Sequence, residues 1–172
     1  MVNGQPESPA VLNGKCLCGT VEYAVQDAFE YAMNCHCSNC RRTTGSAFKP
    51  MAGIRRERLW LVKAKDARLI NGNTDAADDV HCGTCGSLVY SVVREGAYVH
   101  VPMGTLLDTP TIRPAEHIFV GSKAPWYEKS DDLPQYREFP GACDVTTKLA
   151  TTDRCSGKAE MDRIANRLRM RL

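Results

Sequence analysis

The sequence contains no long apolar run and no apolar start. None of its segments approaches the ~18 consecutive apolar residues of a membrane-spanning helix. The first fourteen residues, MVNGQPESPAVLNG, have neither the basic start nor the apolar core of a secretory signal. We therefore expect a cytoplasmic protein with no membrane partner, in a compartment where thiols stay reduced.

The chain also has little excess of either charge. It carries 22 Lys and Arg against 20 Asp and Glu, which leaves a net charge of +2 over 172 residues. This balance gives no general attraction to nucleic-acid phosphates or to anionic surfaces, so it argues against a nucleic-acid partner. The length fits one domain, which is large enough to bury a core and small enough to gain stability from bound metal.

Cysteine is abundant by comparison, and its number is odd. A disulfide framework would leave one of the nine cysteines unpaired. Thiols one or two residues apart can instead reach a single cation, and Zn²⁺ is the cation that thiolates favour. Seven of the nine form three clusters: Cys16-x-Cys18, Cys35-x-Cys37-x-x-Cys40 and Cys82-x-x-Cys85. Seven ligands divide into a closed set of four and an open set of three.

The two cysteine pairs are typical of zinc knuckles. Joined, Cys16, Cys18, Cys82 and Cys85 would make a closed tetrahedral zinc site with a structural role. A pair such as Cys82 and Cys85 can also be a redox dithiol, but that motif usually opens a helix. Here a β-like segment, 88–90, follows the pair, which favours the knuckle.

The cysteine triplet predicts an open zinc site. Cys35, Cys37 and Cys40 supply three thiolates, which leaves the fourth position for water, a substrate or a thiol. Arg41 and Arg42 follow directly and could attract an anionic substrate. These features make the triplet our candidate catalytic centre.

Other residues leave alternatives open. His36 or Cys143 could close the triplet and make it structural, although a His36 ring between two ligands should point away from the metal. Cys143 and Cys155 have no close cysteine neighbours, and we interpret them as free thiols. Three further histidines are acid–base candidates, but a lone histidine in a β-rich segment is more often structural: His81, His100 and His117.

Hydrophobic patterning indicates a mainly β protein. Short β-like runs are separated by Gly, Pro, Asn and Asp at 21–25, 48–54, 59–62, 87–93, 97–101 and 112–120. We expect a flexible leader over 1–13, a zinc domain over 14–140 and a basic, partly helical tail over 141–172. Apolar residues at helical spacing indicate the tail helix, which either packs on the domain or docks onto an acidic partner or nucleic acid: Met161, Ile164, Leu168 and Leu172.

Five motifs in this order resemble the glutathione-dependent formaldehyde-activating enzyme (GFA) / centromere protein V family. They are Gly14-x-Cys16-x-Cys18-Gly19, Cys35-x-Cys37-x-x-Cys40-Arg41, Cys82-x-x-Cys85-Gly86, Pro114-x-x-His117-Ile118 and Lys123-x-Pro125-Trp126. The resemblance covers about 14–140. It implies a mainly β, Mss4-like (β-tent) fold of several small coiled antiparallel sheets stapled by zinc, here followed by the helical tail.

The resemblance also implies ligands and an activity. It assigns a structural zinc to Cys16, Cys18, Cys82 and Cys85, and a catalytic zinc to Cys35, Cys37 and Cys40, so two Zn²⁺ per chain are expected. The family's named activity joins glutathione to formaldehyde as S-(hydroxymethyl)glutathione and is classed as a carbon–sulfur lyase. This chain departs from the common pattern at His81, where an aromatic residue often stands.

Our leading hypothesis is therefore a zinc enzyme of carbon–sulfur chemistry. A thiol, plausibly glutathione as co-substrate, would bind the triplet zinc as a thiolate and attack a small aldehyde such as formaldehyde. The alternatives are a non-catalytic, zinc-stapled binding module and a thiol-redox sensor that releases zinc on oxidation. Small β domains of this type often pair, so a homodimer is compatible with every one of these hypotheses.

Overall fold

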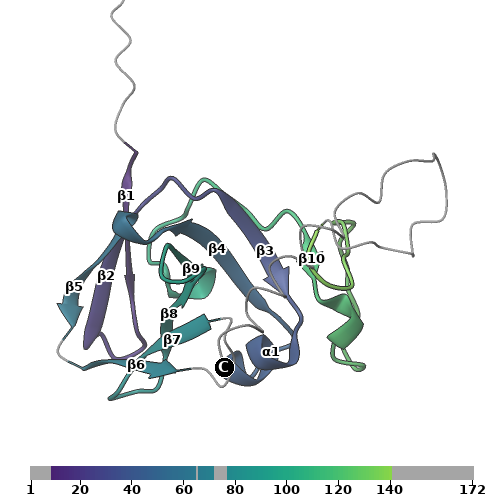
Figure 1. Cartoon of the computed structure of the whole chain (residues 1–172), viewed down its shortest axis with the longest axis horizontal. Helices are drawn as coiled ribbons and strands as arrows, with labels where there is room; N and C mark the ends of the chain where they lie inside the picture. Colours follow the sequence, from purple (N-terminus) through teal and green to yellow (C-terminus); the bar gives the residue numbers. More distant parts are fainter. Residues whose placement is uncertain (1–8, 65, 72–76, 141–172) are drawn as a thin grey trace, which may run out of the picture.

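The computed structural model describes residues 9–64, 66–71 and 77–140, which form two β-sheets. One sheet has three strands in the order β1-β2-β5, and the other has seven in the order β10-β3-β4-β9-β8-β7-β6. All pairings are antiparallel except that of β10 with β3. Figure 1 shows the three-stranded sheet at one end of the molecule and β10 at the other. The mainly β architecture of antiparallel sheets is confirmed.

The elements are short. The strands are β1 (Val11–Lys15), β2 (Val21–Gln26), β3 (Tyr31–Cys35), β4 (Lys49–Arg55), β5 (Leu59–Ala64), β6 (Ala67–Asn71), β7 (Ala77–Cys82), β8 (Leu88–Val93), β9 (Tyr98–Pro102) and β10 (His117–Ile118). Among the described residues, one α-helix and three 3-10 turns accompany them: α1 (Ser38–Thr44), η1 (Arg56–Arg58), η2 (Met103–Thr105) and η3 (Val120–Ser122).

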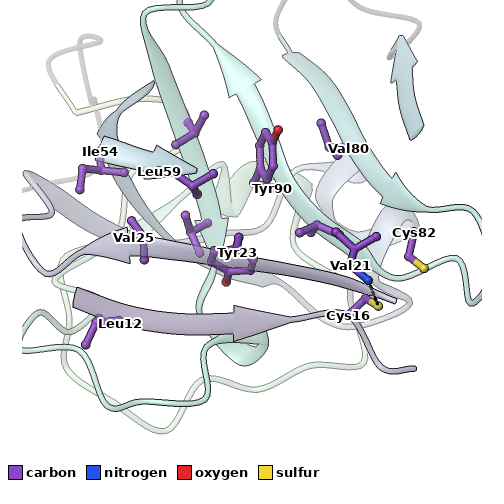
Figure 2. Packing of buried hydrophobic residues seen from close by; sticks show 13 residues of the cluster. Leu12, Cys16, Val21, Tyr23, Val25, Ile54, Leu59, Val80, Cys82 and Tyr90 are labelled. Atoms are coloured by element: carbon purple, nitrogen blue, oxygen red, sulfur yellow. Dashed lines mark hydrogen bonds between the residues drawn. The ribbon is translucent and has the colours of Figure 1, made fainter. Parts of the chain in front are cut away.

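The main core lies between the two sheets. In β1, exposed and buried residues alternate, as expected for a strand with one face against the core. Figure 2 shows the cluster, with Cys16 and Cys82 at one end of it. Its other members are apolar side chains from both sheets: Leu12, Val21, Tyr23, Val25, Ile54, Leu59, Val80, Val89, Tyr90, Val99 and Val101. The first and third cysteine clusters are therefore anchored in the core.

Most of the predicted β runs are strands, with one large exception. The run predicted over 112–120 forms only the two-residue strand β10. Backbone hydrogen bonds to β3 begin at Ala115, directly after Pro114, which lacks an amide donor, and the left-handed backbone of Phe119 (φ 58°) ends the strand. Strand β1 begins at Val11, so the boundary predicted at residue 13 between leader and domain falls inside a strand.

Several predictions concern residues that the structure does not describe. The helical tail over 141–172, with Cys143 and Cys155, lies outside the described residues. Among the described residues, every helix is too short or too polar to cross a membrane.

Candidate metal centres and the adjoining cleft

Four cysteines from distant parts of the chain converge with the spacing of a tetrahedral metal site. The sulfurs of Cys16, Cys18, Cys82 and Cys85 all lie within 4.8 Å of one another. The Sγ atom of Cys18 lies 3.6 Å from that of Cys16 and 3.7 Å from that of Cys82. Sulfurs about 2.3 Å from a tetrahedral zinc stand about 3.8 Å apart, whereas a disulfide requires about 2.05 Å. The cluster therefore fits a cation and not a pair of disulfides.

The two knuckles that supply these thiols have the same backbone design. In each, a glycine follows the second cysteine in the left-handed region, Gly19 at φ 73° and Gly86 at φ 75°. Each glycine amide donates to the carbonyl of the first cysteine of its pair, over 3.1 Å and 2.8 Å respectively. The Val21 amide donates to Cys16 Sγ over 3.3 Å, which favours the thiolate form (Figure 2).

The cysteine triplet lies where β3 passes into α1. Cys35 ends the strand, Cys37 is the N-cap of the helix, and Cys40 lies in the first helical turn. The three sulfurs lie within 4.8 Å of one another. The Cys40 amide donates to Cys37 Sγ over 3.3 Å, so the cap that starts the helix also fixes one thiol. In the described part of the chain, the three sulfurs form a metal-binding group with no fourth protein ligand.

The three thiols of the triplet affect one another's ionisation. Hydrogen bonds from Cys37 and Cys40 raise the pKa of Cys35, whereas hydrogen bonds from Cys35 and Cys40 lower the pKa of Cys37. Three sulfurs this close cannot all ionise on their own, because each thiolate opposes the next. A divalent cation removes that repulsion. Zinc fits this all-sulfur donor set, and the residues present could hold it.

His36 does not belong to the metal-binding group. Its ring is buried against Phe48 and Tyr127, and its Nε2 lies 2.7 Å from Nδ1 of His117. The Nε2 atom of His117 lies 3.1 Å from both carboxylate oxygens of Asp131. Because an ionised carboxylate can only accept, the Nε2–H group of His117 donates to Asp131. The structure places His36 and His117 in a buried hydrogen-bonded chain behind the triplet.

The charge states of these hydrogen-bonded side chains follow from their surroundings. Burial, followed by the neighbouring His117, lowers the pKa of His36 to about 4. Hydrogen bonding to Lys129 is the main effect that lowers the pKa of Asp131 to about 2. At neutral pH an ionised Asp131 therefore orients His117, and His117 orients a neutral His36. Sequence reasoning missed Asp131, since nothing local links it to a histidine fourteen residues earlier.

A cleft of about 610 Å³ opens beside the triplet. Its polar lining comes mainly from α1 and from the seven-stranded sheet, and its apolar lining includes two aromatic rings near the end of the described chain. The lining residues are Cys35, Cys37, Asn39, Cys40, Arg42, Thr43, Lys49, Met51, Ala77, Asp79, Ser91, Val93, His100, Ile118, Phe119 and Phe139. All three candidate ligands of the triplet thus face a space that could admit a substrate.

Of the predicted site residues around the triplet, some line the cleft and others support the backbone. Arg42 lines the cleft, whereas the Arg41 side chain donates to the His36 carbonyl over 3.3 Å and supports the loop. His100 also lines the cleft. The His81 ring pairs instead with the Gly86 carbonyl over 2.9 Å, as a hydrogen-bonded structural histidine would.

The register of strands β3, β4 and β9 places the Tyr31 ring over Gly53, and this position brings the Tyr31 hydroxyl to His100. Gly53 pairs with Tyr31 on one side and with His100 on the other. The Tyr31 ring lies over Gly53, and its hydroxyl is 2.9 Å from Nε2 of His100. Burial, followed by the charge of Lys49, lowers the pKa of His100 to about 4, so this ring is neutral at pH 7.

Gly53 is therefore a position where one added methyl group should be costly. A Cβ on Gly53 would overlap the Tyr31 ring. We expect Gly53→Ala to lower the free energy of unfolding by about 1–3 kcal/mol, the usual cost of overpacking. Gly104→Ala is the matched control, because its Cβ meets nothing within 4 Å. Urea denaturation measures both variants, and equal stabilities would contradict this description of the Tyr31 contact.

The chain is similar to proteins that are already known. The family model for the glutathione-dependent formaldehyde-activating enzyme matches residues 11–122. A Halomonas elongata protein, provisionally named a glutathione-dependent formaldehyde-activating enzyme, is 26% identical over 126 residues, which cover 69% of this chain and 80% of that protein. A Rhodobacter sphaeroides crystal structure is 29% identical, with a TM-score of 0.48, and the match covers 58% of this chain and 91% of that one.

The family model matches more than half of the chain. This chain belongs to the glutathione-dependent formaldehyde-activating enzyme family.

Proposed function

We propose that the protein is a zinc-dependent enzyme that joins a thiol such as glutathione to a small aldehyde such as formaldehyde. The observation that carries the proposal is the cysteine triplet, a three-thiol group that faces a cleft of about 610 Å³. Family membership supports the same substrates. The reaction would be of the carbon–sulfur lyase class, with S-(hydroxymethyl)glutathione as the adduct.

The two cysteine groups would have different roles, one structural and one catalytic. Cys16, Cys18, Cys82 and Cys85 would hold one zinc with a closed shell of protein ligands, which suits a structural role. Cys35, Cys37 and Cys40 would hold the second and leave one position open to the cleft. A zinc ion there supplies the chemistry of thiol activation, since a thiol that coordinates zinc is deprotonated outright at neutral pH.

The cleft residues would bind and orient the reactants. Arg42 lies where it could pair with a carboxylate of a peptide thiol. Apolar side chains such as Phe119 and Phe139 would limit the access of water to the reacting atoms. With a thiol held there as a thiolate, its sulfur would attack the carbonyl carbon, the C–S bond would form as the carbonyl π bond breaks, and protonation of the oxygen would give the hydroxymethyl adduct.

The test is an exchange measurement, because glutathione and formaldehyde also combine without an enzyme. Two-dimensional NMR exchange spectroscopy with ¹³C-formaldehyde and glutathione reports how fast free aldehyde and adduct interconvert. We expect the zinc-loaded protein to accelerate this exchange in proportion to its concentration. An exchange rate equal to that of a protein-free sample would contradict the proposed function.

A further inference from the structure

The floor of the cleft holds a buried lysine. Lys49 is only 6% exposed and lines the cleft, and its Nζ lies 3.3 Å from Oγ of Ser91, itself 1% exposed. Within the described residues, no carboxylate forms an ion pair with Lys49. Lysines are almost never buried without a partner, because removing the ammonium from water is costly. A buried ammonium beside a cleft favours the binding of an anionic ligand in that cleft.

Strand register places this ammonium beside the reacting centre. Lys49 opens β4 and is the cross-strand neighbour of Cys35, which closes β3. Ser91 comes from β8, where it pairs with His100 of β9, so the groups that hold Lys49 belong to the rigid sheet. The lysine and the candidate zinc ligands therefore share one end of the cleft.

We propose that Lys49, held by Ser91, is an oxyanion-binding residue for the aldehyde oxygen. This inference rests on the proposed function. When the thiolate sulfur attacks, the C–S bond forms and the π electron pair of the carbonyl moves to oxygen. The Lys49 ammonium stabilises that alkoxide by a charge-assisted hydrogen bond. The alkoxide takes a proton from water, and the hydroxide left behind takes the proton that the thiol released on binding. Lys49 neither gives up nor gains a proton in this step.

The position of Lys49 favours the aldehyde oxygen over a carboxylate of the thiol. In the adduct the oxygen is separated from sulfur by a single carbon, so it must lie close to the triplet. The carboxylates of glutathione are several bonds further from its sulfur, and Arg42 on α1 is the cleft residue suited to them. A purely electrostatic role, in which Lys49 only offsets the charge of the thiolates, is the competing explanation.

The binding of two small thiols distinguishes these two roles of Lys49. Mercaptoacetate carries an anionic oxygen two carbons from its sulfur, one bond beyond the alkoxide position, and its methyl ester has the same connectivity without the charge. Calorimetry on the zinc-loaded protein gives the ratio of their dissociation constants. We expect Lys49→Met to reduce the preference for mercaptoacetate about 10- to 100-fold, the usual effect of a charge-assisted hydrogen bond. Ser91→Ala should reduce it about 2- to 10-fold.

Lys63→Met is the matched control, because it removes the same charge from an exposed β5 lysine that pairs with Glu22. It should leave the ratio unchanged. If Lys49→Met keeps the preference for mercaptoacetate, or if it weakens the binding of both thiols equally, the inference is overturned while the proposed function stands. If Lys49→Met does not fold, an undiminished preference in Ser91→Ala overturns it. If neither thiol binds the zinc-loaded wild-type protein, the proposed function fails and the inference fails with it.

Discussion

Replacing Cys37 by serine should abolish thiol-dependent turnover and leave the fold in place. Cys37 supplies one of only three sulfurs in the open group and caps α1 as well. A serine hydroxyl can take over the cap, since serine is a favoured N-cap residue. It is a poor zinc ligand at neutral pH because it stays protonated. We therefore expect the formaldehyde–glutathione exchange rate to fall at least about 100-fold, a larger loss than the 10- to 100-fold typical of residues that only support a ligand.

The control for Cys37→Ser is Thr43→Ser, which changes another α1 residue of the same cleft that is not a candidate ligand. Both variants should keep the wild-type far-UV circular dichroism spectrum. Cys37→Ser should bind one zinc fewer than the wild-type protein, whereas Thr43→Ser should bind the same number. Full exchange activity in Cys37→Ser would exclude the triplet as the reacting centre.

Replacing Cys82 by serine should instead remove stability. Cys82 is buried at the end of the main core, and its group joins the first hairpin to β7. Metal binding at closed thiolate sites contributes on the order of 10 kcal/mol to folding, which is comparable to the whole stability of a domain. We expect the variant to be largely unfolded at 37 °C, or to melt at least about 10 °C below the wild-type protein.

Thr84→Ser is the control for Cys82→Ser. It lies between the two cysteines of the same knuckle and keeps the hydroxyl that donates to Asp66 over 2.8 Å. Its melting temperature should stay within about 2 °C of the wild-type value. Excess chelator should lower the wild-type melting temperature towards that of Cys82→Ser. A Cys82→Ser protein as stable as Thr84→Ser would show that the four-thiol group contributes no folding energy.

Sequence reasoning predicted the two cysteine groups because the signal for each half of a group, the spacing of its cysteines, is local. Two thiols two or three positions apart, followed by a glycine, specify a knuckle before anything is known of the fold. The strands that it missed give weaker signals. In β3, Ala32, Met33, Asn34 and Cys35 are all buried, so the strand lacks the alternation that marks one exposed face. Helix α1 has only seven residues and buries none of them, which leaves no amphipathic pattern to detect.

The rest of the cleft depends on register, which no local pattern encodes. Lys49 is close to the triplet because β4 pairs with β3, and His100 is within reach of Tyr31 because Gly53 separates them with no side chain. A shift of one residue in either pairing would turn these side chains to the opposite face. The link between His117 and Asp131 likewise arises only when the chain returns past β10.

Native mass spectrometry tests the central claim most directly, by counting zinc per chain before and after mild chelation and with glutathione added. The account predicts two zinc ions, of which the one at the open triplet is removed first and forms a ternary complex with glutathione. A single tightly held zinc, with no glutathione complex and three unreactive thiols, would contradict an open thiol-binding centre at Cys35, Cys37 and Cys40.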